Sequence, residues 1–170
     1  MGDRLDLRSA MLGKKFDVTY SDRYCKSPMA VMLMFQFIES IKNEFNLDLN
    51  EFDFYSSPIS DPNNRVPIQL RHNYSSDADR DAFIRSNVWD LEISNFDIHS
   101  EESLPHYRYF EFESDDMIVR IRPDGGIEHG WFCDDYTRYD NGNISAFDVF
   151  NIKGYGDGNP ILYTLSVVRK

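Results

Sequence analysis

The stretch KFDVTYSDRYCKSPMAVMLMFQFIESIKNEF, residues 15–45, decides the fold. Apolar and polar residues alternate over residues 15–20, which is the pattern of a strand with one buried face. Ser27 and Pro28 then mark a helix start, because serine caps free backbone N–H groups and proline suits the first helical position. Apolar residues spaced by three and four predict a helix over about residues 28–45.

The rest of the chain adds two more helices and several strands. A helix ending at Gly13 is predicted over residues 2–13, and a serine-capped helix over about 77–90. Further strands are predicted over residues 52–55, 68–70, 91–98, 107–112, 117–121, 127–132 and 161–168. Two strand–helix units followed by an antiparallel run predict an α/β (α+β) fold, a mixed sheet flanked by helices in a single domain, residues 1–170.

Composition limits the classes of function. The hydrophobic fraction of 41% is that of a globular chain rather than a disordered one. The net charge of −11 repels nucleic acid and anionic membranes at long range, so any phosphate binding must occur at a local basic patch. The same charge suits docking on a basic partner, or serves solubility alone.

Signals for a membrane span, a signal peptide, a metal or a cofactor are missing from the sequence. Cys25 and Cys133 are far apart, which favours reduced thiols in a cytoplasmic protein. The four histidines have no metal-ligand spacing, and neither a phosphate-binding GxxxxGK[ST] loop nor a GxSxG elbow occurs. We therefore expect no metal and no cofactor.

The segment around His106 and Arg108, with Arg120 and Arg122 on the next predicted strand, is the strongest functional signal. Imidazole and guanidinium groups together suit phosphate, because guanidinium forks match phosphate oxygens. If the two strands pair around residues 114–116, the four side chains can line one surface. Alternatively, these residues belong to a solvated sheet face on which they pair with Glu111, Glu113 and Asp115.

Asp22 adds a carboxylate to this set of candidates. It follows the first predicted strand, and ligands in open α/β sheets bind at the carboxyl ends of strands. We expect Asp22 to orient His106 or Arg108, although a role as an ordinary turn residue is equally compatible with its position.

Four segments of the sequence together resemble a known family. They are residues 18–24, Ser27-Pro28 with the helix that follows, His106-Tyr107-Arg108, and residues 118–126. They are similar to the phospholipase-D-like domain at the C-terminus of MIT-domain trafficking proteins, and to C-terminal segments of bacterial helicases, including phage-defence-linked ones. The resemblance covers about residues 14–45 and 104–132.

The resemblance implies a mixed α/β sheet flanked by helices, and often a dimer. Active phospholipase-D enzymes carry His-x-Lys-x4-Asp, whereas here Arg108 follows His106 in place of the lysine and Glu113 stands in place of the aspartate. These departures put catalysis in doubt, since arginine and lysine hold phosphate differently. The trafficking branch binds phospholipid headgroups, a poor target for so acidic a chain.

We therefore predict a non-catalytic phospholipase-D-like accessory domain, of a bacterial helicase or defence system, that binds nucleic acid or a protein partner. His106, Arg108, Arg120 and Arg122 would hold a phosphate group or an acidic partner, with Asp22 orienting them. One rival is a phosphodiesterase or nuclease with His106 as nucleophile, in a homodimer that completes the site. The other is an acidic domain that docks on a basic protein without any phosphate site.

Overall fold

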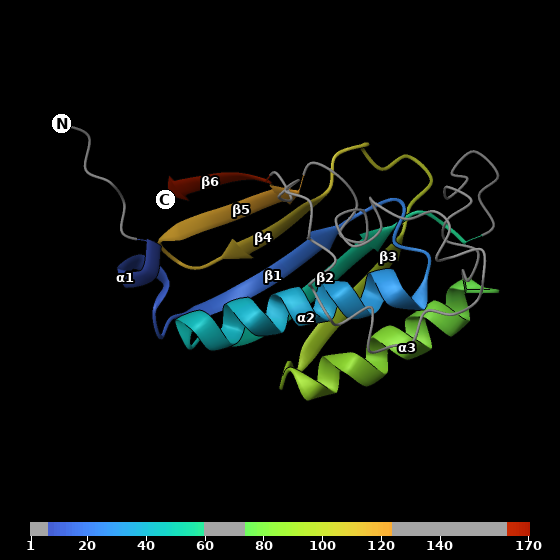
Figure 1. Ribbon diagram of the computed structural model, residues 1–170, viewed down its shortest axis with the longest axis horizontal. Coiled ribbons are helices and arrows are strands. Elements are labelled where there is room, and N and C mark those ends of the chain that lie inside the picture. Colours follow the sequence, from blue (N-terminus) through green and yellow to red (C-terminus); the bar gives the residue numbers. More distant parts are fainter. Residues whose placement is uncertain (1–6, 60–73, 124–162) are drawn as a thin grey trace, which may run out of the picture.

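The computed structural model describes residues 7–59, 74–123 and 163–170 (Figure 1). Its elements follow in the order α1 (Leu7–Met11), β1 (Lys15–Ser21), α2 (Pro28–Phe45), β2 (Asp48–Ser56), α3 (Asp77–Asp90), β3 (Asn95–Ser100), β4 (Tyr109–Glu113), β5 (Met117–Pro123) and β6 (Tyr163–Arg169). The strands form one six-stranded sheet in the order β3-β2-β1-β4-β5-β6. The pairs β1–β2 and β2–β3 are parallel, and the pairs from β1–β4 to β5–β6 are antiparallel. The predicted mixed α/β sheet with flanking helices is confirmed.

The helix α2 has the predicted bounds because its ends are fixed locally. The Ser27 hydroxyl accepts a hydrogen bond from the Ala30 N–H at 3.1 Å, and Pro28 occupies the first turn. At the other end Asn46 takes the left-handed conformation, with φ of 49°, which stops the helix. A serine N-cap such as Ser27 stabilises a helix by about 1 kcal/mol.

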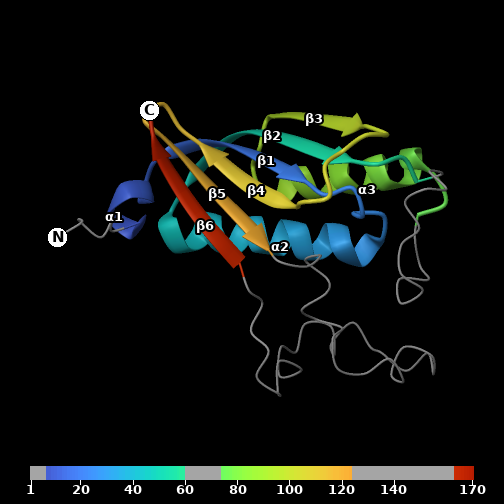
Figure 2. The same cartoon turned by 90° about the horizontal axis from the view of Figure 1, so that it is seen from above.

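The core lies between the sheet and the two long helices, which cover the same face of the sheet (Figures 1 and 2). Alternate residues of the central strands point into it, and the largest are fully buried: Phe16, Tyr20, Phe52, Phe54, Phe110 and Phe112. The rings of Phe35 on α2 and Phe52 on β2 lie 5.6 Å apart between their centroids. In the described part of the chain, no helix covers the opposite face, which carries the polar residues of each strand and is called the open face below.

Some predicted boundaries were wrong. The strand predicted over 91–98 begins only at Asn95, because Leu91 ends α3 and packs into the core, and Glu92 takes a positive φ of 61°. The first helix ends at Met11, two residues before the predicted end at Gly13, which has a φ of +69°. The strands predicted over 68–70 and 127–132 lie outside the described residues.

The topology creates a switch point at the carboxyl end of β1. From β1 the chain moves through α2 and β2 to β3 on one side, then crosses to the other side of β1 to form β4. Crevices that bind ligands in open α/β sheets form where the strand order switches in this way. Here, Asp22 follows β1, and Arg108 immediately precedes β4.

Candidate functional site

Asp22 is the buried anchor of the switch point. Its side chain is fully shielded from solvent, and its carboxylate accepts hydrogen bonds from the Tyr24 N–H at 2.8 Å and the Tyr20 hydroxyl at 3.0 Å. The third donor is Nε of Arg108, also at 3.0 Å. Burial raises the pKa of Asp22 above its usual value, while the Arg108 charge and these hydrogen bonds oppose the rise. The carboxylate therefore holds Arg108 in a fixed position.

Three nitrogen-bearing side chains gather around the Tyr24 ring. The guanidinium carbons of Arg23 and Arg108 lie 5.3 and 5.0 Å from the ring centroid, a cation–π distance. The His106 ring lies between Arg23 and the Tyr24 hydroxyl. Its Nε2 is 3.0 Å from Arg23 Nη1, and its Nδ1 is 3.2 Å from the Tyr24 hydroxyl oxygen. We call Arg23, Tyr24, His106 and Arg108 the corner cluster.

The corner cluster fixes the tautomer of His106. A guanidinium has no acceptor, so Nε2 of His106 must accept the hydrogen bond from Arg23. The proton of the neutral imidazole is then on Nδ1, which donates to the Tyr24 hydroxyl. The lone pair of His106 Nε2 thus accepts a hydrogen bond from Arg23. It is therefore not available for nucleophilic attack.

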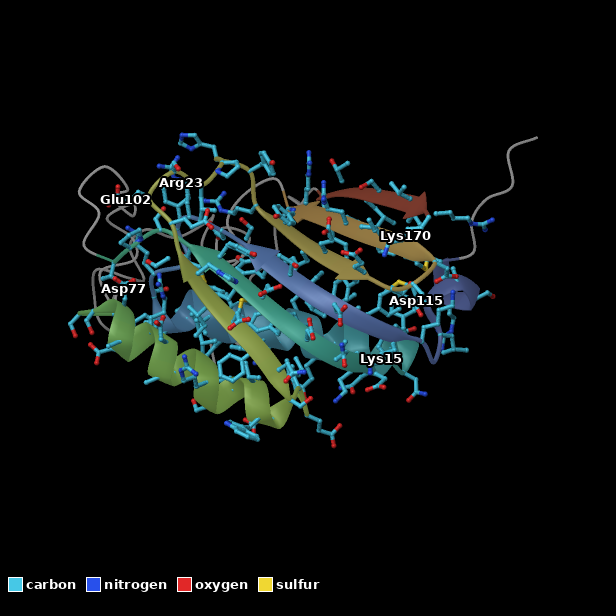
Figure 3. The ribbon with its side chains drawn as sticks, turned by 180° about the vertical axis from the view of Figure 1, so that it is seen from behind. Lys15, Arg23, Asp77, Glu102, Asp115 and Lys170 are labelled. Carbon is cyan, nitrogen blue, oxygen red and sulfur yellow. The ribbon has the colours of Figure 1, made fainter. Side chains whose placement is uncertain are left out.

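The corner cluster is accessible from solvent. His106 is exposed, Arg23 and Tyr24 are half-buried, and the Arg108 side chain keeps 19% of its surface exposed. Figure 3 places Arg23 at the end of the sheet opposite Lys15 and Asp115. Two guanidinium groups and an imidazole that converge on one exposed corner can hold an anion.

Arg120 and Arg122 belong to a separate group on the open face. Arg120 lies opposite Glu111 on β4, and its Nε donates to the Glu111 carboxylate at 2.6 Å. The Arg120 guanidinium also lies 5.1 Å from the Tyr109 ring centroid, and that of Arg122 lies 4.7 Å from the Tyr107 centroid.

The structure therefore brings Asp22, His106 and Arg108 together and sets Arg120 and Arg122 apart. Of the two partners considered for Asp22, Arg108 makes the direct contact. The pairing of Arg120 with Glu111 matches the alternative in which this arginine pairs with strand carboxylates.

Arg23 was missed as a site residue by the sequence reasoning. The signal was present, because Arg23 follows Asp22 in the turn between β1 and α2, where the switch point lies. Its contact with His106 joins positions 83 residues apart, which no local pattern indicates.

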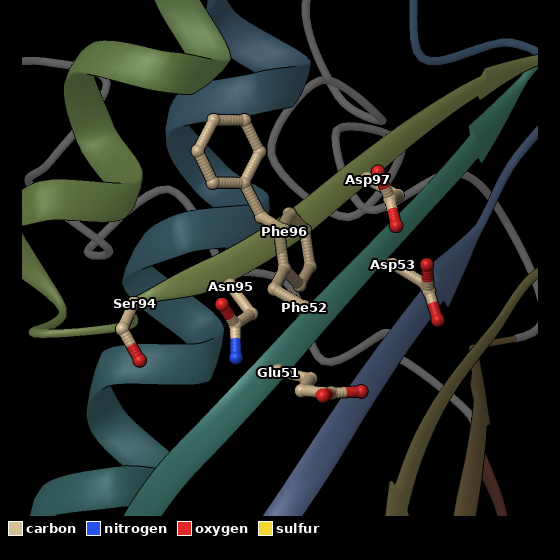
Figure 4. A pocket seen from close by; sticks show the side chains of 7 residues that line it. All are labelled: Glu51, Phe52, Asp53, Ser94, Asn95, Phe96 and Asp97. Carbon is tan, nitrogen blue, oxygen red and sulfur yellow. The ribbon is translucent and has the colours of Figure 1, made fainter.

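The open face over β2 and β3 has the opposite character. A hollow of about 430 Å³ there is lined mainly by carboxylates and other polar groups, with Phe52 and Phe96 on the helix side (Figure 4). Its acidic residues are Glu51, Asp53 and Asp97, and Asp53 also contacts His99 at 3.1 Å. Negative charge at this hollow repels phosphate, so the hollow itself is unsuited to an anion.

Within residues 7–59, 74–123 and 163–170, no group of three or more His, Cys, Asp or Glu side chains is arranged to hold a metal ion. In those ranges, too, no helix has both the length and the apolar character to cross a membrane.

Comparison with known proteins gives the family. Residues 5–148 match the family model of the C-terminal domain of the DEAD/DEAH box helicase YjiV. A search of curated proteins finds no match. The helicase part of the sequence resemblance is confirmed, whereas its phospholipase-D-like part stays a prediction. Because the match spans most of the sequence, this chain belongs to the family of YjiV-type DEAD/DEAH helicase C-terminal domains.

Proposed function

We propose that this chain is a non-catalytic accessory domain that binds a phosphate group of nucleic acid at the corner cluster for its helicase. One observation carries the proposal: the guanidinium groups of Arg23 and Arg108 converge with His106 on the Tyr24 ring, and buried Asp22 holds Arg108 in place. The helicase family supplies the context in which a nucleic acid is the expected ligand.

The physical basis is pre-organisation. Arginine side chains lose much rotamer entropy when they bind a ligand, but here their positions are already set by Asp22, Tyr24 and His106. Planar guanidinium groups then offer paired donors to phosphate oxygens. The charge of Arg108 is partly balanced by Asp22.

The absence of catalysis is also part of the proposal. The His106 lone pair already accepts a hydrogen bond from Arg23. Glu113, which stands where the phospholipase-D motif has its aspartate, lies at the far end of β4, opposite Asp17 and in contact with Lys170. These positions support a binding role for His106 over a role as nucleophile.

The test is a titration of labelled DNA at low and moderate salt with the wild-type chain, Arg23→Gln and Arg8→Gln. Arg8 is the matched control, because it is an exposed arginine of α1 that pairs with Glu44. We expect Arg23→Gln to weaken binding about tenfold, the equivalent of one charged hydrogen bond, and Arg8→Gln to leave it unchanged. Equal binding by all three proteins would contradict the proposal, and cleavage of the DNA would favour the nuclease rival.

The acidic hollow favours a second candidate function. Glu51, Asp53 and Asp97 line it and would attract a lysine- or arginine-rich segment of a protein partner. Salt-sensitive binding of a basic peptide that is lost in Asp97→Asn would support this alternative. A chain that binds such a peptide but not DNA would replace the first proposal with the second.

A further inference from the structure

We propose that the open face beside the corner cluster stacks unpaired bases of a single-stranded nucleic acid on a row of aromatic rings. The row consists of His99, Tyr55, Tyr109 and Tyr107. This inference rests on the proposed function and adds to it the class of nucleic acid that the domain prefers.

The strand register aligns the row. His99 lies opposite Tyr55, Tyr55 opposite Ser21, and Ser21 opposite Tyr109, which takes the line across β3, β2, β1 and β4. The His99 and Tyr55 rings stack with centroids 4.2 Å apart and an interplanar angle of 11°. On the other side of Ser21, the Tyr109 ring centroid lies 5.9 Å from that of Tyr107. The row therefore consists of two ring pairs, separated by Ser21, along the carboxyl end of the parallel strands.

The row lies on the open face. Tyr55 and Tyr109 alternate with the buried Phe54 and Phe110, so they point away from the helices, and these two tyrosines and His99 are half-buried. Tyr107 keeps 50% of its surface exposed. Exposed aromatic rings on a sheet face are suited to base stacking, which tolerates any sequence because every base has a π-face.

Two arginines accompany the rings. Arg122 lies over Tyr107 at 4.7 Å and is exposed, whereas Arg120 lies over Tyr109 and is paired with Glu111. Arg122 is therefore the better placed of the two to contact a phosphate of a bound strand.

The row adjoins the corner cluster along the chain. Tyr107 and Tyr109 flank Arg108, which turns the other way to contact Asp22. A strand whose bases lie on the tyrosines would meet Arg122 on the same face of the sheet. Two residues further down the strands, Asp53 and Asp97 repel phosphate and confine the path to the row.

Single-strand selectivity follows from the stacking. A base inside a duplex has its faces covered by its neighbours and cannot stack on a protein ring without being extruded. An unpaired strand presents those faces freely, so the tyrosines add to its affinity and not to that of a duplex.

The test compares oligothymidylate with an abasic oligodeoxyribose phosphate of the same length, so that the charge is equal and only the bases differ. The proteins are the wild type, Tyr107→Ala and Tyr107→Phe, the last of which keeps the ring. We expect oligothymidylate to bind about tenfold more tightly than the abasic strand, Tyr107→Ala to remove most of that difference, and Tyr107→Phe to keep it.

The outcomes separate this inference from the proposed function. Equal binding of both strands, unchanged in Tyr107→Ala, would overturn base stacking while the phosphate site stands. Binding of neither strand would overturn both.

Discussion

Replacing Arg108 with methionine tests the anchoring of the corner cluster by a buried ion pair. Methionine keeps a flexible stem of similar length but removes the charge, the guanidinium over Tyr24 and the donor to Asp22. The carboxylate of Asp22, which is fully buried, then loses its opposite charge. Removing one partner of a buried pair is destabilising because the remaining charge stays without compensation.

The magnitude follows from the 3.0 Å separation of Arg108 Nε and Asp22 Oδ1. At that distance unit charges attract by about 5.5 kcal/mol for an effective dielectric constant near 20, and by about 1.4 kcal/mol in water. Arg108 is 19% exposed and Asp22 is not exposed at all. We therefore expect Arg108→Met to lower the free energy of unfolding by about 3 kcal/mol at neutral pH.

The loss of unfolding free energy in Arg108→Met should depend on pH. Burial already raises the pKa of Asp22 above 3.8, and removal of Arg108 raises it further. When the pKa of a carboxyl is higher in the folded than in the unfolded protein, the carboxyl does not destabilise the fold at a pH below the unfolded-state pKa, because it is protonated in both states. The destabilisation grows as the pH rises above the unfolded-state pKa and is complete above the folded-state pKa. The difference between the proteins should therefore be small near about pH 4 and largest near about pH 7.5.

Urea unfolding of both proteins at these two pH values checks the prediction. Arg122→Met is the control, because this arginine is exposed on the open face, and its loss should change stability by no more than about 0.5 kcal/mol. A loss below about 1 kcal/mol at neutral pH, or one that is the same at both pH values, would refute the ion-pair reasoning.

Two further substitutions test the scaffold. Ser27→Ala removes the side-chain acceptor at the start of α2 and should lower the free energy of unfolding in urea by about 1 kcal/mol. An unchanged unfolding midpoint would mean that the cap does not stabilise the helix. Phe52→Ala empties a fully buried position against Phe35 and should cost about 3–5 kcal/mol, while a cost under about 1 kcal/mol would contradict the packing described for this core.

The elements that the sequence predicts best have local signals. The helix α2 has a cap, a proline and a regular apolar spacing within its own residues, and its bounds are as predicted. The strand β3 begins later than predicted, because Leu91 and Ile93 are apolar for a different reason: they are buried as part of the connection from α3. An apolar run alone does not distinguish a strand from a buried connection.

The candidate site was harder to predict from local signals than the helices and strands. The contact between Asp22 and the segment of His106 and Arg108 was predictable, because Asp22 follows one predicted strand and the segment lies at the start of another. The separation of Arg108 from Arg120 was not, because it depends on a register in which Arg120 lies opposite Glu111. A shift of one residue moves every side chain of a strand to the other face, and the sequence does not state the register.

The most direct measurement is an NMR titration of the arginine Nε–H signals with short oligothymidylate. Chemical shifts report each guanidinium separately, without any substitution in the site. We expect the signals of Arg23 and Arg108 to move as the oligonucleotide is added, while that of Arg8 stays in place. No movement at Arg23 and Arg108, or equal movement at Arg8, would contradict phosphate binding at the corner cluster.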